Sequence, residues 1–125
     1  MKFNQVTLFG ATGLIGGYLL EFLLKDSDVH LINVVGRTPF HLQHDKINNI
    51  VIDFEDVGSI SDSIAGSEVV FVSIGTTMSK VKGDKLKYKK VDFDIIFNIA
   101  NACKKKKIKQ LLYVSSLGAN SNSSN

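Results

Sequence analysis

Three glycines, at positions 10, 13 and 16, constrain the fold of this 125-residue chain more than any other feature. They lie in the segment GATGLIG, which follows the apolar run Gln5–Phe9 and opens an apolar helical pattern over residues 14–25. In that setting Gly10 permits a tight turn out of a strand, and Gly16 lets a helix pack closely against a sheet. The segment therefore predicts a β-strand, a tight turn and an α-helix in succession.

Residues 3–20 carry no charged side chain, and a run of this length raises the question of a membrane span or a signal peptide. The run contains four glycines and several polar side chains, and only one lysine precedes it. A buried strand, a glycine turn and a buried helix explain it better. With no other candidate segment, the sequence predicts a soluble, cytoplasmic protein without membrane association, in which Cys103 is reduced.

Short apolar runs alternate with helical patterns along the chain. We predict β-strands at residues 5–9, 29–35, 50–54, 69–74 and 111–115, and α-helices at residues 14–25, 60–65 and 91–107. This alternation is typical of an α/β fold with a parallel sheet, whose crossover connections are right-handed. The sequence thus predicts a Rossmann-type, doubly wound parallel sheet of five strands in the order 3-2-1-4-5.

The apolar positions of two helices predict what each helix buries. In residues 14–25 they cover so wide a stripe that we expect this helix to pack deeply. In residues 91–107 they form one face, and Cys103 lies on it, so we expect this thiol in the core rather than as a nucleophile. Asp92 and Asp94 are expected in the first turn of that helix, and lysines in its last turn, as the helix dipole favours.

Length and composition indicate a single domain, residues 1–125, because 44% apolar and 22% charged residues are ordinary for a globular protein of this size. One cysteine and three histidines without ligand spacing predict no metal site. A full dinucleotide-binding sheet has six strands, and residues 117–125 are polar. We therefore expect the domain to be incomplete at its C-terminus. The sequence does not predict an oligomeric state.

The net charge of +3 hides two unlike halves. Residues 1–79 hold four Lys or Arg against nine Asp or Glu, a net of −5, whereas residues 80–125 hold eleven Lys against three Asp, a net of +8. The lysine cluster at 104–107 is compatible with nucleic-acid binding, but no aromatic residues interleave for base stacking. A solvated helix end is the favoured interpretation, and we predict no nucleic-acid partner.

The glycine segment also carries a functional prediction. Gly13 lets the backbone approach a pyrophosphate closely, and the N-terminus of the following helix offers free N–H groups to phosphates. The spacing is G-x-x-G-x-x-G rather than G-x-G-x-x-G. The alternative is a turn that needs glycine for packing alone. On the first interpretation, a nicotinamide dinucleotide is bound by the turn residues Gly10, Thr12, Gly13, Leu14, Ile15 and Gly16.

The end of the second predicted strand favours one form of this cofactor. An NAD site usually has a carboxylate there for the ribose 2′-hydroxyl, whereas this chain has Arg37. A guanidinium pairs with a 2′-phosphate through two N–H groups. NADP(H) is therefore predicted in preference to NAD(H), although a surface arginine at a strand end is the alternative.

Six segments together resemble one superfamily. They are GATGLIG (10–16), VVGR (34–37), IDF (52–54), VSIGTT (72–77), KVDFD (90–94) and YVSSLGAN (113–120). On these segments, nearly the whole chain resembles the atypical branch of the short-chain dehydrogenases/reductases, and within it the NAD(P)H-binding, Tat-interacting-protein-like oxidoreductases. The resemblance implies a nicotinamide-dependent oxidoreductase that acts on a carbonyl or hydroxyl substrate, whose identity the sequence does not predict.

The resemblance implies further cofactor contacts. Asp53 would accept a hydrogen bond from the adenine amino group, with Phe54 beside the ring; a solvated strand-end aspartate is the alternative. Ser73, Gly75 and Thr76 would border the ribose and the nicotinamide; for Gly75 the alternative is a role in the turn alone. All of these positions lie at or just after the ends of predicted strands.

For catalysis the resemblance implies a serine at the end of the fifth strand, and Ser115 and Ser116 both qualify. Such a serine would orient the substrate beside a tyrosine acid from a Tyr-x-x-x-Lys pair, and no such pair follows Ser116. We therefore expect this chain alone to be inactive. Three hypotheses remain open: an oxidoreductase, a non-catalytic nucleotide-binding regulator or scaffold, and a piece of a longer enzyme.

Overall fold

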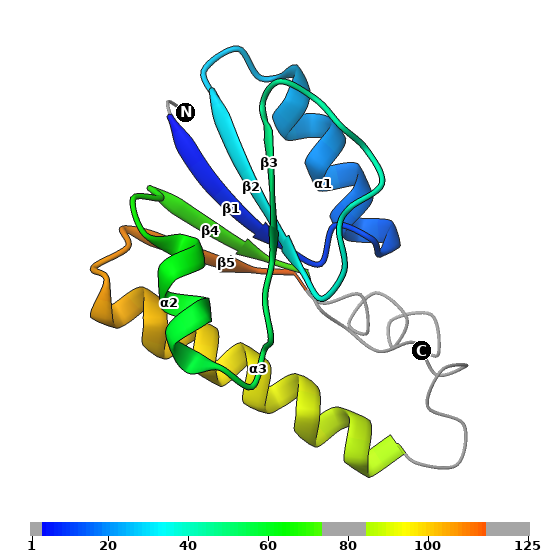
Figure 1. Cartoon of the computed structure of the whole chain (residues 1–125), viewed down its shortest axis with the longest axis vertical. Helices are drawn as coiled ribbons and strands as arrows, with labels where there is room; N and C mark the ends of the chain where they lie inside the picture. Colours follow the sequence, from blue (N-terminus) through cyan, green and yellow to red (C-terminus); the bar gives the residue numbers. More distant parts are fainter. Residues whose placement is uncertain (1–3, 74–84, 115–125) are drawn as a thin grey trace, which may run out of the picture.

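Five parallel strands form one sheet in the order β3-β2-β1-β4-β5, as predicted (Figure 1). The structure is a computed structural model that describes residues 4–73 and 85–114. Its strands are β1 (Gln5–Phe9), β2 (Leu31–Gly36), β3 (Ile47–Val51), β4 (Val69–Val72) and β5 (Gln110–Tyr113). Its helices are α1 (Leu14–Lys25), α2 (Val57–Ile64) and α3 (Lys85–Lys105).

The sheet is doubly wound, because helices cover both of its faces. Figure 1 shows α1 on one side of the sheet and α2 with α3 on the other. Alternate residues of β1 supply the two cores: Val6 and Leu8 pack with Leu20 and Leu23 of α1, and Phe9 packs in the core under α2 and α3. Strands buried on both faces explain the near-continuous apolar runs of β1, β2 and β4.

Helix α1 has the predicted bounds but not the predicted burial. Gly16, Leu20 and Leu23 are buried, whereas Leu14, Tyr18 and Phe22 are 74%, 65% and 64% exposed. The exposed side chains are four residues apart and so form one stripe of the helix. The prediction of deep packing was wrong because a helix on the outside of a sheet buries only the face turned toward that sheet.

Strand β3 lies three residues earlier than predicted, over Ile47–Val51 instead of 50–54. It is an edge strand held by pairing with β2, from Ile32 opposite Ile47 to Gly36 opposite Val51. Polar residues are tolerated at an edge, where one side faces solvent. The apolar pattern therefore placed the start of this strand too late.

Helix α3 begins at Lys85, six residues before the predicted start. Its first turn contains no acidic residue, so Asp92 and Asp94 lie inside the helix rather than at its start. Lysine and leucine are good helix formers, which explains why the helix extends into the lysine-rich stretch before residue 91. The helix ends at Lys105, and Lys107 adopts a left-handed conformation with φ of 58°.

Cys103 lies in the core under α3, as predicted, and is 4% exposed. Burial raises the pKa of its thiol to about 11, which disfavours the reactive thiolate at neutral pH. No helix among residues 4–73 and 85–114 combines the length and apolar character that a membrane span requires.

A ladder of polar side chains crosses three strands of the buried sheet. Thr7 of β1 lies opposite Asn33 of β2, which lies opposite Asn48 of β3. The amide of Asn33 donates to the Thr7 hydroxyl at 3.3 Å and accepts from the Asn48 amide at 3.0 Å. Thr7 also shares a hydrogen bond with Ser67. These bonds satisfy buried polar atoms in a way that fits only this strand register.

Candidate nucleotide-binding site

The predicted site residues lie where the strands end. Gly10 follows β1, Arg37 follows β2, Asp53 and Phe54 come shortly after β3, and Ser73 follows β4. Because all five strands run parallel, their carboxyl ends meet at one edge of the sheet (Figure 1). Ligands of open α/β sheets bind at this edge. Four of the predicted positions lie outside the described residues: Gly75, Thr76, Ser115 and Ser116.

The glycine turn connects β1 to the start of α1. Gly10 has a φ of +96°, a conformation that side chains other than glycine rarely adopt, and its carbonyl accepts from the Gly13 N–H at 3.2 Å. Gly13 is the N-cap of α1, and no side chain caps it. The first intrahelical bond runs from Gly17 N–H to the Gly13 carbonyl at 2.8 Å. The N–H groups of the first helical turn therefore have no acceptor within the helix and suit an anion.

Gly16 packs α1 against the turn. A Cβ at this position would lie 1.9 Å from the Gly10 carbonyl oxygen, far inside van der Waals contact. Thr12, Gly13 and Leu14 of the turn are exposed. Glycine at position 16 is thus required for packing, while residues 12–14 of the turn stay exposed.

Arg37 and Phe54 stack at the ends of β2 and β3. The Arg37 guanidinium carbon lies 5.7 Å from the centroid of the Phe54 ring, within the range of a cation–π contact. The Phe54 ring packs in turn against Phe9, with centroids 6.0 Å apart. The Ile52 N–H donates to the Gly36 carbonyl at 3.0 Å, so pairing with β2 continues past the end of β3 and brings Phe54 alongside Arg37.

Asp53 forms a tight turn between β3 and α2. Its carboxylate accepts from the Glu55 N–H at 2.9 Å, and its carbonyl accepts from the Asp56 N–H at 2.9 Å. The Asp53 side chain is exposed. One carboxylate oxygen is thus committed to the turn, and the other is free of hydrogen bonds among the described residues.

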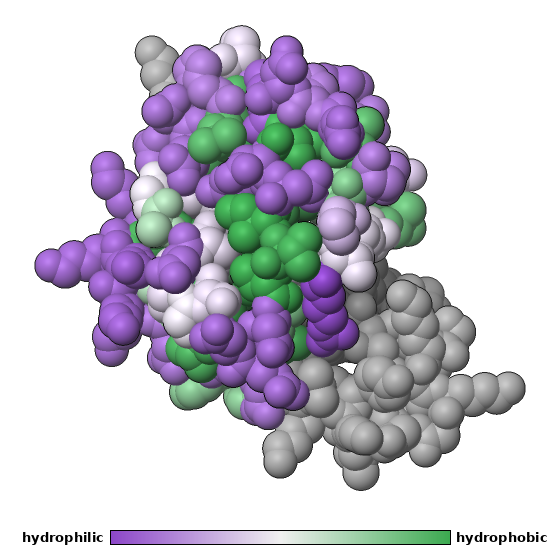
Figure 2. All heavy atoms as spheres, viewed as in Figure 1, coloured by the Kyte–Doolittle hydropathy of each residue, from purple (hydrophilic) through white to green (hydrophobic). Residues whose placement is uncertain are grey.

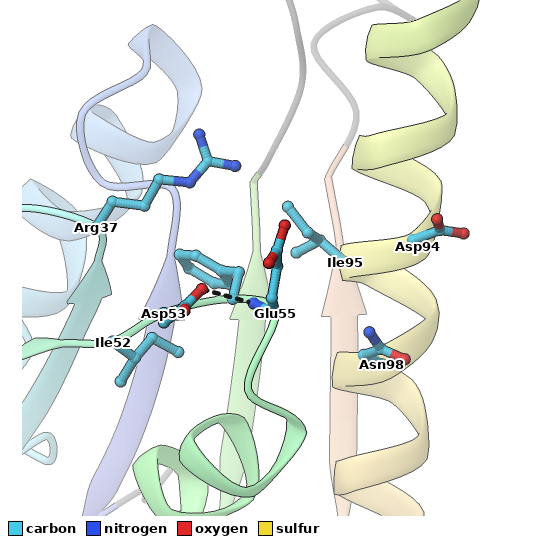
Figure 3. A pocket seen from close by; sticks show the side chains of 8 residues that line it. Arg37, Ile52, Asp53, Glu55, Asp94, Ile95 and Asn98 are labelled. Atoms are coloured by element: carbon cyan, nitrogen blue, oxygen red, sulfur yellow. Dashed lines mark hydrogen bonds between the residues drawn. The ribbon is translucent and has the colours of Figure 1, made fainter.

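A pocket of about 610 Å³ lies between these strand ends and α3 (Figure 3). Figure 2 shows hydrophobic atoms in the middle of the face drawn in Figure 1, over the segment that leads from β3 to α2, with hydrophilic atoms around them. The pocket brings together the predicted residues Arg37, Asp53 and Phe54. It is completed by residues that sequence reasoning missed: Ile52, Glu55, Asp94, Ile95 and Asn98.

Some signals for the missed residues were present in the sequence. Glu55 adjoins two predicted site residues, and Asp94 and Asn98 are four residues apart on α3, hence on one side of it. What no local pattern indicates is that α3 lies across the pocket from Arg37. Ser73 is not among the pocket residues; its N–H donates to the Phe9 carbonyl at 2.8 Å and extends the pairing of β4 with β1. In the described part of the chain, no three His, Cys, Asp or Glu side chains cluster as metal ligands.

The comparison with protein families decides the family. The profile of a family described as NAD(P)H-binding matches residues 10–125, which is nearly the whole chain. The chain belongs to this NAD(P)H-binding family. The match begins at Gly10, the residue whose positive φ forms the turn.

Curated relatives support the same assignment and confirm the family resemblance drawn from the sequence. Protein HTATIP2 of Rattus norvegicus is 29% identical over 127 residues, which cover 99% of this chain and 52% of that protein. Protein FMP52, mitochondrial, of Debaryomyces hansenii is 31% identical over 120 residues, which cover 93% of this chain and 51% of that protein. The chain thus spans about half the length of the curated relatives it matches.

A solved structure shares the fold at similar identity. A short-chain dehydrogenase/reductase of Veillonella parvula, in complex with NADP, is 25% identical, with a TM-score of 0.66. The match covers 95% of this chain and 50% of the other. The Rossmann-type architecture is therefore confirmed by comparison as well as by strand order.

The names of the curated relatives contradict the predicted cytoplasmic location, so that prediction is wrong. Several FMP52 relatives are named as mitochondrial proteins. The prediction rested on composition and on the lack of a signal-like or membrane-spanning run. Organelle delivery is read from targeting segments, and the composition of a folded nucleotide-binding domain does not encode it.

Proposed function

We propose that this chain binds NADP(H) at the carboxyl edge of its sheet, as the nucleotide-binding part of an oxidoreductase. The observation that carries this proposal is Arg37 stacked on Phe54 at a pocket beside the strand ends. Arg37 is exposed, and no carboxylate lies within ion-pair distance of it among the described residues. Its N–H groups are therefore available to a 2′-phosphate, to which a guanidinium binds through two hydrogen bonds.

The rest of the site fits the same molecule. The uncapped start of α1 suits the pyrophosphate, with Gly10, Gly13 and Gly16 keeping the backbone close to it. A pocket of about 610 Å³ is within the range of small-molecule sites, and its Phe54 and Ile95 side chains supply apolar contact for an adenine ring. The free oxygen of Asp53 is placed to accept a hydrogen bond from the adenine amino group.

The chemistry belongs to the whole protein. When bound, the reduced cofactor would supply a hydride to a carbonyl, or the oxidised cofactor would accept one from a hydroxyl substrate, and the protein binds, orients and shields the cofactor. We propose a carbonyl or hydroxyl substrate, oriented by Ser115 or Ser116, on the resemblance to short-chain dehydrogenases/reductases. The NADP complex of the Veillonella parvula protein supports the proposed cofactor.

The proposal is tested by replacing Arg37. We expect Arg37→Glu to weaken NADPH binding about 10- to 100-fold, since hydrogen bonds to charged groups contribute about 1.5–3 kcal/mol. NADH has no 2′-phosphate, so its affinity is expected to change far less. Both dissociation constants are measured by titrating the fluorescence of the reduced nicotinamide.

Lys104→Glu provides the matched control. It makes the same change of charge in the last turn of α3, outside the pocket. The control is expected to bind both cofactors as the unaltered chain does. Unchanged NADPH affinity in Arg37→Glu would overturn the assignment of Arg37 to the 2′-phosphate, and no saturable binding of either cofactor at millimolar concentration would overturn the proposed function.

A further inference from the structure

We propose that Glu55 sets the balance between NADP(H) and NAD(H) at this site, by opposing the 2′-phosphate that Arg37 attracts. The inference rests on the proposed function and adds a specificity-determining residue to it. The motivating observation is the charge of the pocket. Three carboxylates line it, those of Asp53, Glu55 and Asp94, against the single guanidinium of Arg37.

The three carboxylates are not equivalent. Asp53 is engaged by the backbone N–H of Glu55 at 2.9 Å, and Figure 3 shows that bond as a dashed line. Asp94 extends from α3 and points away from Arg37 in the same view. The Glu55 carboxylate points along the pocket toward the side on which the Arg37 guanidinium lies. Glu55 is therefore the carboxylate best placed to act on a group held by Arg37.

The Glu55 carboxylate has no charged partner among the side chains that the structure describes. Among the side chains that the structure describes, those of residues 4–73 and 93–114, the one ion pair joins Lys25 and Glu21, and no hydrogen bond involves the Glu55 carboxylate. Arg37 and Glu55 thus face the same pocket without pairing with each other. A phosphate held by Arg37 would therefore be attracted by Arg37 and repelled by Glu55.

These two charges act differently on the two cofactors. A 2′-phosphate carries about −1.5 to −2 charge at neutral pH, so Arg37 attracts it and Glu55 repels it. The 2′-hydroxyl of NAD(H) is neutral and is not repelled by a carboxylate, to which it can donate a hydrogen bond. Glu55 therefore lowers the preference for NADP(H) that Arg37 alone would produce. Because both side chains are exposed, water and salt weaken the effect to a few-fold.

The experiment compares the ratio of NADPH to NADH affinity in three variants. Glu55→Gln keeps the shape and removes the charge, and we expect it to bind NADPH about threefold more tightly, with NADH affinity unchanged. Asp94→Asn removes a carboxylate from the same pocket on the side away from Arg37, and Asp62→Asn removes one outside the pocket. Both are expected to leave the ratio near its original value. The gain in Glu55→Gln should shrink at high salt.

The possible results separate the two proposals. If Glu55→Gln leaves the ratio unchanged, or alters both affinities equally, the role of Glu55 is overturned while cofactor binding stands. If Asp94→Asn shifts the ratio as much as Glu55→Gln, the effect belongs to the total charge of the pocket and the assignment to Glu55 fails. If the unaltered chain binds neither cofactor, the proposed function fails, and this inference fails with it.

Discussion

At the scale of single residues, two neighbouring glycines of α1 have opposite surroundings. A Cβ at Gly16 would lie 1.9 Å from the Gly10 carbonyl oxygen and 2.7 Å from the carbonyl carbon, so the backbone itself would have to move. A Cβ at Gly17 would lie 3.7 Å from the Ala11 carbonyl oxygen, an ordinary contact. Of these two glycines, only Gly16 is required for the close approach of the helix to the turn. The proposed phosphate site depends on that approach.

Alanine substitutions at these two positions should act in opposite directions. We expect Gly16→Ala to lower the free energy of unfolding by roughly 1–3 kcal/mol, as overpacking does, and to weaken NADPH binding because the turn is displaced. Gly17→Ala should raise the free energy of unfolding by up to about 1 kcal/mol, since alanine is favoured over glycine in a helix interior. Urea unfolding monitored by circular dichroism measures both. Equal effects of the two variants would contradict this account of the turn.

At the scale of elements, the N-cap of the short helix α2 is joined to the turn that lines the pocket. Asp56 caps the helix: its carboxylate accepts from the Ser59 N–H at 3.3 Å and from the Ser59 hydroxyl at 2.9 Å. These two hydrogen bonds hold the pKa of Asp56 below its ordinary value of 3.8. Because Asp56 also donates its N–H to the Asp53 carbonyl, the cap and the pocket turn form one unit.

The cap makes stability depend on pH in a defined direction. A carboxyl group whose pKa is lowered by folding stabilises the folded state above its ordinary pKa of 3.8, and this contribution is lost as the pH falls below that value. We expect Asp56→Ala to melt at a lower temperature than the unaltered chain at pH 7, with a smaller difference near pH 3. Asp56→Asn should keep most of the cap at both pH values, because asparagine is also a good N-cap. Equal melting of Asp56→Ala and the unaltered chain at pH 7 would contradict the capping role.

At the scale of the whole molecule, the polar ladder joins elements that are far apart in the chain. Asn33 links Thr7 of β1 to Asn48 of β3, and Thr7 is bonded to Ser67, just before β4. Thr7 and Asn33 are buried. The ladder joins the neighbouring strands β3, β2 and β1 and the residue Ser67 just before β4. It forms only when each strand is in its observed register.

Removing the middle of the ladder should destabilise the entire sheet. We expect Asn33→Leu to lower the free energy of unfolding by about 1–3 kcal/mol, since the buried Thr7 hydroxyl loses a partner and the Asn48 amide loses another. Asn48→Ala should lower the free energy of unfolding by less, because Asn48 lies on the edge strand, where water can replace its amide as a partner of Asn33. Chemical unfolding of both variants measures the difference. An unfolding free energy of Asn33→Leu equal to that of the unaltered chain would show that the ladder does not contribute to stability.

The sequence by itself determined the features that depend on local backbone requirements. The bounds of β1 and α1 follow from the glycine turn, because only glycine tolerates the positive φ of Gly10 and the contact at Gly16. The strand order follows from alternating elements and right-handed crossovers, and Arg37 follows from its place at a strand end. Asp53 and Phe54 were predicted from the family resemblance of the sequence.

Only the tertiary structure decided the features that depend on neighbours distant in the chain. The bounds of β3 are decided by pairing with β2, and the exposed stripe of α1 by which face meets the sheet. The pocket is decided by α3, which sets Asp94, Ile95 and Asn98 opposite Arg37 and residues 52–55, all far earlier in the chain. A local pattern specifies which secondary structure a segment can form, whereas packing between segments decides which side chains meet. For this reason the structure was needed to identify Glu55 and the α3 residues as part of the pocket.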